Sequence, residues 1–415
     1  RIAGLSLVGF CGSGIYLNGV LASGNTITNC RSASLLAAAG NSVAAVEIEN
    51  APGNTVGPGN VFSGNEYGVL ISGIGAFQNQ VFGNILGADA TGKLADPNST
   101  AGVVIESGAG NNLVGGGGAA KRNLLSGNGV AGIWIKDYLT ENNVVSGNFI
   151  GVDITGTKAL PNGADGVQIE EGASRNLIGG DNALERNIIS GNPGDGVNIF
   201  AFGAGFQTLA NHVTGNYVGT DVTGTKAIPN GIYGVEIAGI NPLYGNYIGG
   251  SAPGEGNIIS GNAVRGVHLG GQGAQVNYVQ GNVIGLDSRG VNALPNGDAG
   301  VLVSNGSKLN IIGGAGLGEG NTITGNASAG IILIETTGEV VQGNRIGLDY
   351  ENNFTGNGFA GVEIFSGSHT VGGTKDGEAN LICGHFGNGI YVEDGSNQNT
   401  FRHNRIFAND RAGIR

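Results

Sequence analysis

Apolar and polar residues alternate along this chain in short runs that are separated by glycine and asparagine. The commonest run reads Gly-Val/Ile-x-Ile/Leu/Val, as in "GIWI" at 132–135, "GVQI" at 166–169 and "GVEI" at 234–237. In a strand, the second and fourth residues of such a run share one face and the third residue takes the other. Because each run is so short and ends at Gly or Asn, the pattern predicts strands and argues against helices.

The same signature recurs throughout the sequence. Copies begin at residues 14, 68, 102, 132, 166, 196, 234, 266, 300, 330, 361 and 389. Long and short intervals alternate, so the full repeat is a pair of units of roughly 65 residues. A strand of four residues cannot bury its apolar face alone, whereas stacked units would share a continuous core of Val and Ile. The repeat therefore predicts a β-solenoid with three short strands in each coil.

The repeated GVxI strands and the Gly-Asn pairs between them resemble right-handed parallel β-helix proteins, the pectate-lyase-like superfamily with its secreted bacterial β-helix repeats. The resemblance covers the whole chain and implies an all-β, right-handed parallel β-helix of about 13 coils, alternately long and short. Residues 1–415 are then one β-helix domain, expected to be a segment of a longer repeat protein. The superfamily includes polysaccharide lyases, glycoside hydrolases, epimerases, phage tailspikes and adhesins.

Asparagine follows glycine at matching places in successive units. The long units carry it at 84, 148, 216, 282 and 344, and the short units at 128, 192, 262 and 326. Asn and Gly tolerate the left-handed backbone of a sharp corner. Stacked asparagine side chains can also hydrogen-bond to one another, so we expect structural corners at these positions.

Composition narrows the range of partners. The chain has 84 glycines among 415 residues, a net charge of −12 and a pI near 4.8. An acidic surface without a basic stripe repels phosphate backbones, so nucleic acid is not an expected partner. Apolar runs stay far below the ~18 residues that a membrane span needs, so membrane insertion is not expected either. We expect an extracellular, secreted or cell-surface protein.

Five long units carry an aspartate in a polar segment: Asp89, Asp153, Asp221, Asp287 and Asp349. Three of these segments read "DATG", "DITG" and "DVTG". The pattern favours a turn in which Asp accepts hydrogen bonds from backbone amides two residues on. Calcium is the alternative, although each segment offers one carboxylate where a calcium site usually has several. No cofactor is required by the sequence.

Chemistry in this superfamily usually lies on the outer face of one sheet, which here corresponds to the third residue of GVxI and the residue after its end. An aromatic patch there would stack on sugar rings. The residues expected to contact a glycan are Trp134, Tyr138, Gln168, Asn198 and Phe200.

Glu236 and His268 occupy equivalent positions in adjacent coils and are candidates for a proton-transfer pair. Glu170 lies two coils before Glu236, at roughly 10 Å, near the upper limit for two carboxylates of an inverting glycosidase. The Asp-Pro-His-Glu block of alginate epimerases is absent from the sequence.

Two functions remain open after these observations. The first is an extracellular scaffold, such as a surface fibre, an adhesin or a carbohydrate-binding rod that also associates end to end or laterally. The second is a secreted polysaccharide lyase or glycoside hydrolase that uses the outer face of the GVxI sheet. The sequence does not decide whether the protein is an enzyme.

Overall fold

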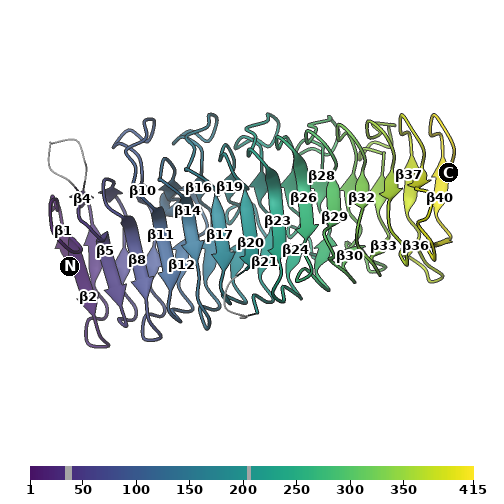
Figure 1. Cartoon of the computed structure of the whole chain (residues 1–415). Helices are drawn as coiled ribbons and strands as arrows, with labels where there is room; N and C mark the ends of the chain where they lie inside the picture. Colours follow the sequence, from purple (N-terminus) through teal and green to yellow (C-terminus); the bar gives the residue numbers. More distant parts are fainter. Residues whose placement is uncertain (33–39, 203–206) are drawn as a thin grey trace. The chain divides into compact units, whose positions relative to one another are not determined.

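Short parallel strands account for the architecture of the chain (Figure 1). The computed structural model describes residues 1–32, 40–202 and 207–415. Their strands form three parallel sheets of 14, 13 and 13 strands, here named A, B and C. Each coil runs through sheets C, A and B in turn, which makes the fold a right-handed parallel β-helix of about 13 coils. The predicted fold is confirmed.

The contacts of the chain cluster into two compact units, Arg1–Asn198 and Ile199–Arg415. In the first unit, sheet A contains β1 (Ile2–Ala3), β3 (Thr26–Thr28), β6 (Thr55–Val56), β9 (Gln80–Val81), β12 (Leu113–Gly115), β15 (Val144–Ser146) and β18 (Leu177–Gly179). Sheet B contains β4 (Arg31–Ser32), β7 (Val61–Phe62), β10 (Ile85–Leu86), β13 (Leu124–Leu125), β16 (Phe149–Ile150) and β19 (Ile188–Ile189). Sheet C contains β2 (Ile15–Asn18), β5 (Ala44–Glu49), β8 (Tyr67–Ser72), β11 (Ala101–Glu106), β14 (Ala131–Ile135) and β17 (Val167–Glu170). Strand β20 (Val197–Ala201) contains the division between the units.

The second unit repeats this order. Its sheet A contains β21 (His212–Thr214), β24 (Tyr247–Gly249), β27 (Tyr278–Gln280), β30 (Ile311–Gly313), β33 (Val340–Gln342), β36 (Thr370–Gly372) and β39 (Thr400–Arg402). Sheet B contains β22 (Tyr217–Val218), β25 (Ile258–Ile259), β28 (Val283–Ile284), β31 (Thr322–Ile323), β34 (Arg345–Ile346), β37 (Leu381–Cys383) and β40 (Arg405–Phe407). Sheet C contains β23 (Tyr233–Gly239), β26 (Arg265–Gly270), β29 (Val301–Ser304), β32 (Ile331–Leu333), β35 (Val362–Ile364) and β38 (Ile390–Val392).

Helical structure among the described residues is limited to the 3-10 turn η1 (Ala119–Lys121). No helix in the described part of the chain is long and apolar enough to cross a membrane.

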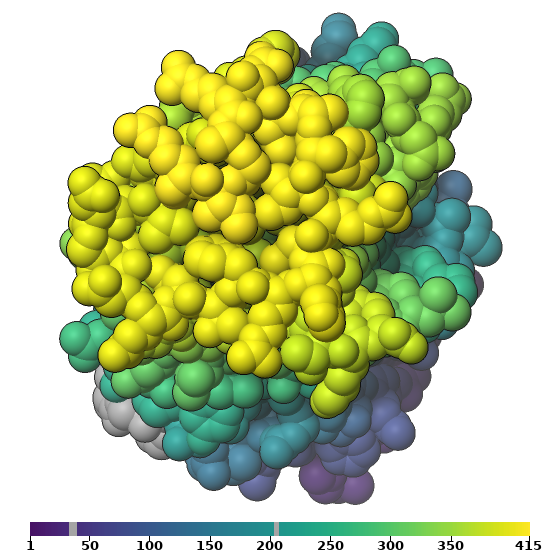
Figure 2. Space-filling model, turned by 90° about the vertical axis from the view of Figure 1, so that its right-hand side faces the viewer, coloured from purple at the N-terminus to yellow at the C-terminus, as the bar shows by residue number. Residues whose placement is uncertain are grey.

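Columns of identical or similar apolar side chains form the core of each unit. In sheet A of the first unit, Val81, Val114, Val145 and Ile178 succeed one another with no exposed surface. Parallel register places each of them on its neighbour, as in the pairs Val81–Val114 and Val114–Val145. Stacking thus removes the apolar face of every short strand from water, which is the main stabilising term for such a repeat. In Figure 2 the C-terminal residues of the second unit, in yellow, face the viewer.

Buried asparagines form ladders at the corners of the coils. Asn123, for example, accepts hydrogen bonds from the backbone N and Nδ2 of Asn84 at 3.0 and 3.1 Å. Its own Nδ2 donates to the Val81 carbonyl at 2.8 Å and to Asn148 Oδ1 at 2.9 Å. Each side chain therefore satisfies backbone groups that a corner would otherwise leave buried without partners. The predicted asparagine stacking is confirmed.

In one asparagine ladder of the second unit, a glutamate and then a histidine take the place of asparagine after Asn310. Asn310 donates its backbone N–H to Glu339 Oε2 at 2.7 Å, and Glu339 donates its own to His369 Nδ1 at 3.2 Å. The side chains of Glu339 and His369 have almost no exposed surface. Burial raises the pKa of Glu339 to about 7 and lowers the pKa of His369 to about 4. The neutral forms of both groups are therefore favoured in this ladder.

Candidate active site on the outer face of sheet C

The outer face of sheet C in the second unit brings Glu236 and His268 together. The strands β23 and β26 pair in parallel with Glu236 opposite His268. Residues Val235, Ile237, Val267 and Leu269 on the same strands point into the core and are fully buried. The period of two in a strand then turns Glu236 and His268 outward. The adjacency predicted from the sequence repeat is thus present in the structure.

A short hydrogen bond joins the two side chains. His268 Nδ1 lies 2.7 Å from Glu236 Oε1. The histidine is 6% exposed, and the Glu236 side chain is 17% exposed. An ionised carboxylate can only accept, so it holds the imidazole proton at Nδ1 and leaves Nε2 as the acceptor on the other side of the ring. A histidine in that tautomer is arranged to take up a proton through Nε2.

An aromatic ring and an ion pair border this pair. The Tyr233 ring lies 4.8 Å from the His268 ring, centroid to centroid, at a tilt of 51°. Arg265 Nη2 forms an ion pair with Asp298 Oδ2 at 2.8 Å, and its Nε donates to the same oxygen. The guanidinium charge is therefore already paired.

A pocket of about 490 Å³ opens over Glu236 and His268. Its remaining walls include Phe202, Gln272, Asn305 and several small residues of β23 and β26. None of the described residues that line it is a lysine or an arginine. The described lining therefore combines an apolar ring, two amide side chains and a hydrogen-bonded carboxylate–imidazole pair, without a lysine or an arginine.

The first unit holds a different cluster around Trp134. The indole Nε1 donates to Glu170 Oε1 at 2.6 Å, and Lys136 Nζ lies 4.7 Å from the centroid of the indole ring. Lys136 also pairs with Glu106 at 3.2 Å. Burial raises the pKa of Glu170 to about 7, against the opposing effect of the indole hydrogen bond. Glu170 thus serves as the partner of Trp134, and a catalytic role for it stays a prediction.

The other residues expected to contact a glycan are Gln168, Tyr138, Asn198 and Phe200. Gln168 is the register partner of Trp134, and Tyr138 is an exposed residue of the turn that follows β14. Asn198 donates to Asp165 Oδ2 at 3.2 Å. In the second unit, Phe200 packs on Phe202 with ring centroids 6.0 Å apart. Glycan contact by these residues stays a prediction.

The five aspartates lie in loops between sheets B and C, which we call T-loops. Each T-loop is closed by an antiparallel bridge: Ala88–Ala95, Val152–Ala159, Thr220–Ala227, Leu286–Ala293 and Leu348–Phe354. In the second of these loops Asp153 Oδ1 accepts from the Thr155 hydroxyl at 2.7 Å and from backbone N–H groups four and five residues on. Asp89 bonds in the same way. The backbone amide two residues on also bonds to each of these aspartates, as the sequence predicted, and the threonine hydroxyl and the two later amides add to it.

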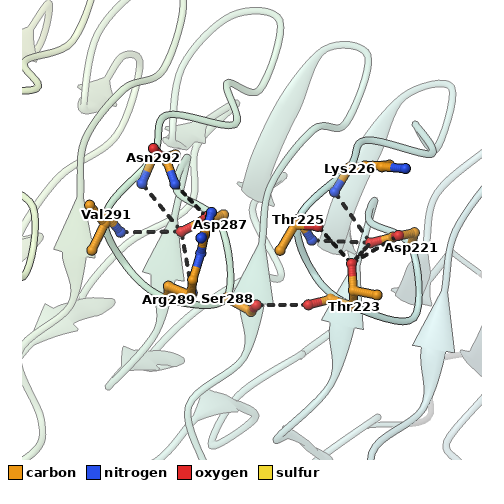
Figure 3. A network of polar contacts seen from close by, with 9 residues as sticks. All are labelled: Asp221, Thr223, Thr225, Lys226, Asp287, Ser288, Arg289, Val291 and Asn292. Atoms are coloured by element: carbon orange, nitrogen blue, oxygen red, sulfur yellow. Dashed lines mark hydrogen bonds and ion pairs between the residues drawn. The ribbon is translucent and has the colours of Figure 1, made fainter.

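Figure 3 shows two T-loops of the second unit beside each other. Asp287 accepts from the backbone N–H of Arg289, two residues on, as the sequence predicted. Burial alone would raise the pKa of Asp287, but hydrogen bonds from Asn292, Arg289 and Val291 lower it to about 2. Ser288 donates its backbone N–H to Gly224 O and its hydroxyl to Thr223 O of the preceding T-loop, both at 2.8 Å.

These hydrogen bonds hold the backbone of each T-loop and connect Ser288 to the preceding T-loop. Asp221 and Asp349 likewise accept hydrogen bonds from within their own loops. In the described part of the chain, no three His, Cys, Asp or Glu side chains gather as metal ligands. Calcium binding by a T-loop stays a prediction.

Ser304 is a member of the outer-face cluster to which the sequence pattern assigned no role. Its hydroxyl lies 2.9 Å from His268 Nε2. Alternation along β29 turns Ser304 outward, but it pairs in register with Gly270 rather than with His268. The sequence signal for this contact is Gly270 opposite Ser304, because a glycine there leaves space for the side chain of His268.

Neither a family model nor the sequence of a curated protein matches this chain. Solved structures of the same fold do match. A periplasmic alginate epimerase, AlgG, superposes with a TM-score of 0.52 at 12% identity, over 94% of this chain and 77% of the other. The A-module of the Azotobacter vinelandii mannuronan C-5 epimerase AlgE4 gives a TM-score of 0.40 at 13% identity, over 99% and 96% of the two chains. The catalytic domain of a GH87 alpha-1,3-glucanase gives 0.25 at 10% identity, over 92% and 61%. The first likeness shows a shared fold.

Proposed function

We propose that this chain is a polysaccharide-acting β-helix protein that works outside the cytoplasm. A glycan binds in the pocket of sheet C, and His268, oriented by Glu236, transfers a proton to or from it. The observation that carries the proposal is the 2.7 Å bond between His268 Nδ1 and Glu236 Oε1 at the wall of a 490 Å³ pocket. The shared fold with a periplasmic alginate epimerase makes polysaccharides the first class to test.

The pocket chemistry favours a neutral glycan over a polyuronate. Phe202 offers an apolar face for a sugar ring, and the amides of Gln272 and Asn305 suit sugar hydroxyls. A polyuronate would bring carboxylates to a chain of net charge −12, at a pocket whose described lining has no cation. Together with the missing Asp-Pro-His-Glu block, these features argue against alginate as the substrate.

The second candidate is a non-catalytic scaffold, such as a glycan-binding surface fibre or adhesin. It is favoured by the Trp134 cluster, in which the indole of the lone tryptophan donates to Glu170 and lies against Lys136. Such contacts order an aromatic ring for stacking on a sugar.

The test is a panel of neutral and anionic polysaccharides incubated with wild type, His268→Ala and Phe202→Ala. We expect binding of a neutral polymer that falls at least tenfold in Phe202→Ala, and conversion that is lost in His268→Ala with binding retained. Conversion is followed by new reducing ends, unsaturated products and released small molecules. Binding without conversion in wild type would favour the scaffold, and equal conversion by His268→Ala would refute the proposal.

A further inference from the structure

The bond between Glu236 and His268 is one half of a longer chain of contacts. Glu236 Oε1 lies 2.7 Å from His268 Nδ1, and His268 Nε2 lies 2.9 Å from Ser304 Oγ. The three residues belong to β23, β26 and β29, which are consecutive strands of sheet C. A carboxylate, an imidazole and a hydroxyl in this order are the elements that activate a serine nucleophile.

Gly270 makes the contact to Ser304 geometrically available. In register, His268 pairs with Leu302, whereas Ser304 pairs with Gly270 two residues farther along β26. The imidazole leans over Gly270, because a Cβ built there would lie only 2.7 Å from His268 Nε2. A side chain at residue 270 would therefore push the ring away from Ser304. The glycine is needed for that clearance, since its backbone φ is not in the left-handed region.

The surroundings fit a sheltered nucleophile with donors nearby. Ser304 and His268 are only 5% and 6% exposed, so water has little access to the bond between them. The pocket wall includes Gly270, the register partner of Ser304, and Asn305, the residue that follows it. Amide N–H groups of Asn or Gln side chains stabilise the oxyanion of acyl transfer in other serine enzymes. Asn305 and Gln272 are the lining residues that carry such groups.

We propose that Glu236, His268 and Ser304 form a catalytic relay that hydrolyses acyl esters on a neutral glycan. Ser304 is the nucleophile and His268 the general base and acid, while Glu236 is a positioning residue that fixes the histidine tautomer. The glycan part rests on the proposed function. An uncharged ester suits a pocket whose described lining lacks cations.

The reaction balances with water as the only co-reactant. His268 Nε2 takes the hydroxyl proton as Ser304 Oγ bonds to the acyl carbon. The bond from that carbon to the sugar oxygen breaks, and the sugar oxygen leaves with the proton from Nε2. Water then attacks the acyl carbon and gives its proton to Nε2, the bond from that carbon to Ser304 Oγ breaks, and Nε2 returns the proton to Oγ. The products are a free sugar hydroxyl and a carboxylic acid.

The experiment measures acyl release from O-acetylated polysaccharides and from p-nitrophenyl acetate. It compares wild type with Ser304→Ala, Gly270→Ala and, as a control, Ser251→Ala, which removes an exposed serine outside the relay. A fluorophosphonate probe, followed by peptide mass analysis, locates any activated serine. Circular dichroism and thermal melting check that each variant is folded.

We expect Ser304→Ala to lose at least roughly a hundredfold in acyl release and to bind the polysaccharide as wild type does. The probe should label Ser304 in wild type and in Ser251→Ala, and should fail to label it in Gly270→Ala. Replacing Glu236 by Gln should lower kcat strongly, leave KM nearly unchanged and alter the pH profile, which a merely structural role would not do.

The outcomes separate this inference from the proposed function. Conversion of a polysaccharide that depends on His268 but is unchanged in Ser304→Ala would overturn the serine relay and leave the proposed function standing. Serine-dependent release from p-nitrophenyl acetate without binding of any polysaccharide would support the relay and refute the glycan assignment. Acyl release that Ser304→Ala retains would also overturn the relay.

Discussion

Glu339 places an acidic group inside an asparagine ladder, so replacing it by glutamine should change how stability depends on pH. Its Oε2 accepts from the Asn310 backbone N–H at 2.7 Å, and its Oε1 lies in contact with the Thr336 hydroxyl. The side chain has no exposed surface. Glutamine has nearly the same shape as the protonated acid, and its amide can accept from Asn310 and donate to the Thr336 side.

The direction in which stability changes with pH follows from the pKa of Glu339 in the folded and unfolded states. Burial raises the pKa of Glu339 from 4.5 to about 7 in the folded protein. Below pH 4.5 Glu339 is protonated in both the folded and the unfolded state, so it does not lower the free energy of unfolding. As the pH rises toward 7, the unfolded chain releases the proton while the folded chain keeps it, so stability falls. At about 1.4 kcal/mol for each pH unit, the total loss is roughly 3 kcal/mol and is complete above pH 7.

The assay is native-state hydrogen exchange of the β33 amides, Val340–Gln342, in wild type and Glu339→Gln between pH 5 and pH 8. Local exchange is preferred because repeat proteins need not unfold in one step. The difference in opening free energy should move in favour of the variant by about 2 to 3 kcal/mol across this range. The pKa of His369 is lowered from 6.5 to about 4, so this residue makes stability rise with pH between those values in both proteins, and its contribution largely cancels in the difference.

A matched control is Glu335→Gln, which alters an exposed acid in the same coil. Its pH dependence should follow that of wild type. Parallel curves for wild type and Glu339→Gln, with no change in their separation, would refute the assignment of a neutral Glu339 in the ladder.

Three further changes test other parts of the structure. Asn123→Ala removes four buried side-chain hydrogen bonds and should lower the free energy of unfolding in urea by roughly 3 to 5 kcal/mol. Asn397→Ala, at an exposed position, should lower it by less than about 0.5 kcal/mol. Equal effects of the two changes would count against the ladders. Asp221→Ala should speed amide exchange in its T-loop, and added Ca²⁺ should not change the melting temperature of wild type; a Ca²⁺-dependent rise that the variant lacks would instead establish a metal site. Trp134 is the only tryptophan, so its emission should titrate near pH 7 as Glu170 loses its proton, and the titration should vanish in Glu170→Gln; a flat wild-type curve would contradict the raised pKa of Glu170.

The repeat pattern predicted the fold well because strand alternation and corner residues are local properties. The period of two turned Val235 and Ile237 inward and Glu236 outward, and the regular spacing placed His268 beside it. Register between adjacent coils is therefore readable from sequence wherever the repeat is regular.

Side-chain contacts between residues that are not register partners were not predictable in the same way. His268 leans from its own column over Gly270 to reach Ser304, and this depends on a side-chain rotamer and on the space above a glycine. Glu339 likewise occupies an asparagine position, yet its burial and raised pKa follow from three-dimensional neighbours. Alternation shows which face a residue takes, while the direction of its side chain within that face needs the structure.

The most direct test of the central claim is the side-chain ¹⁵N NMR spectrum of His268, assigned among the five histidines by comparison with His268→Ala. We predict that free wild type shows the Nδ1-protonated tautomer, that Glu236→Gln loses this preference, and that a bound neutral polysaccharide shifts the Nε2 signal. The account is contradicted if a polysaccharide binds the protein while both His268 nitrogen signals stay unchanged.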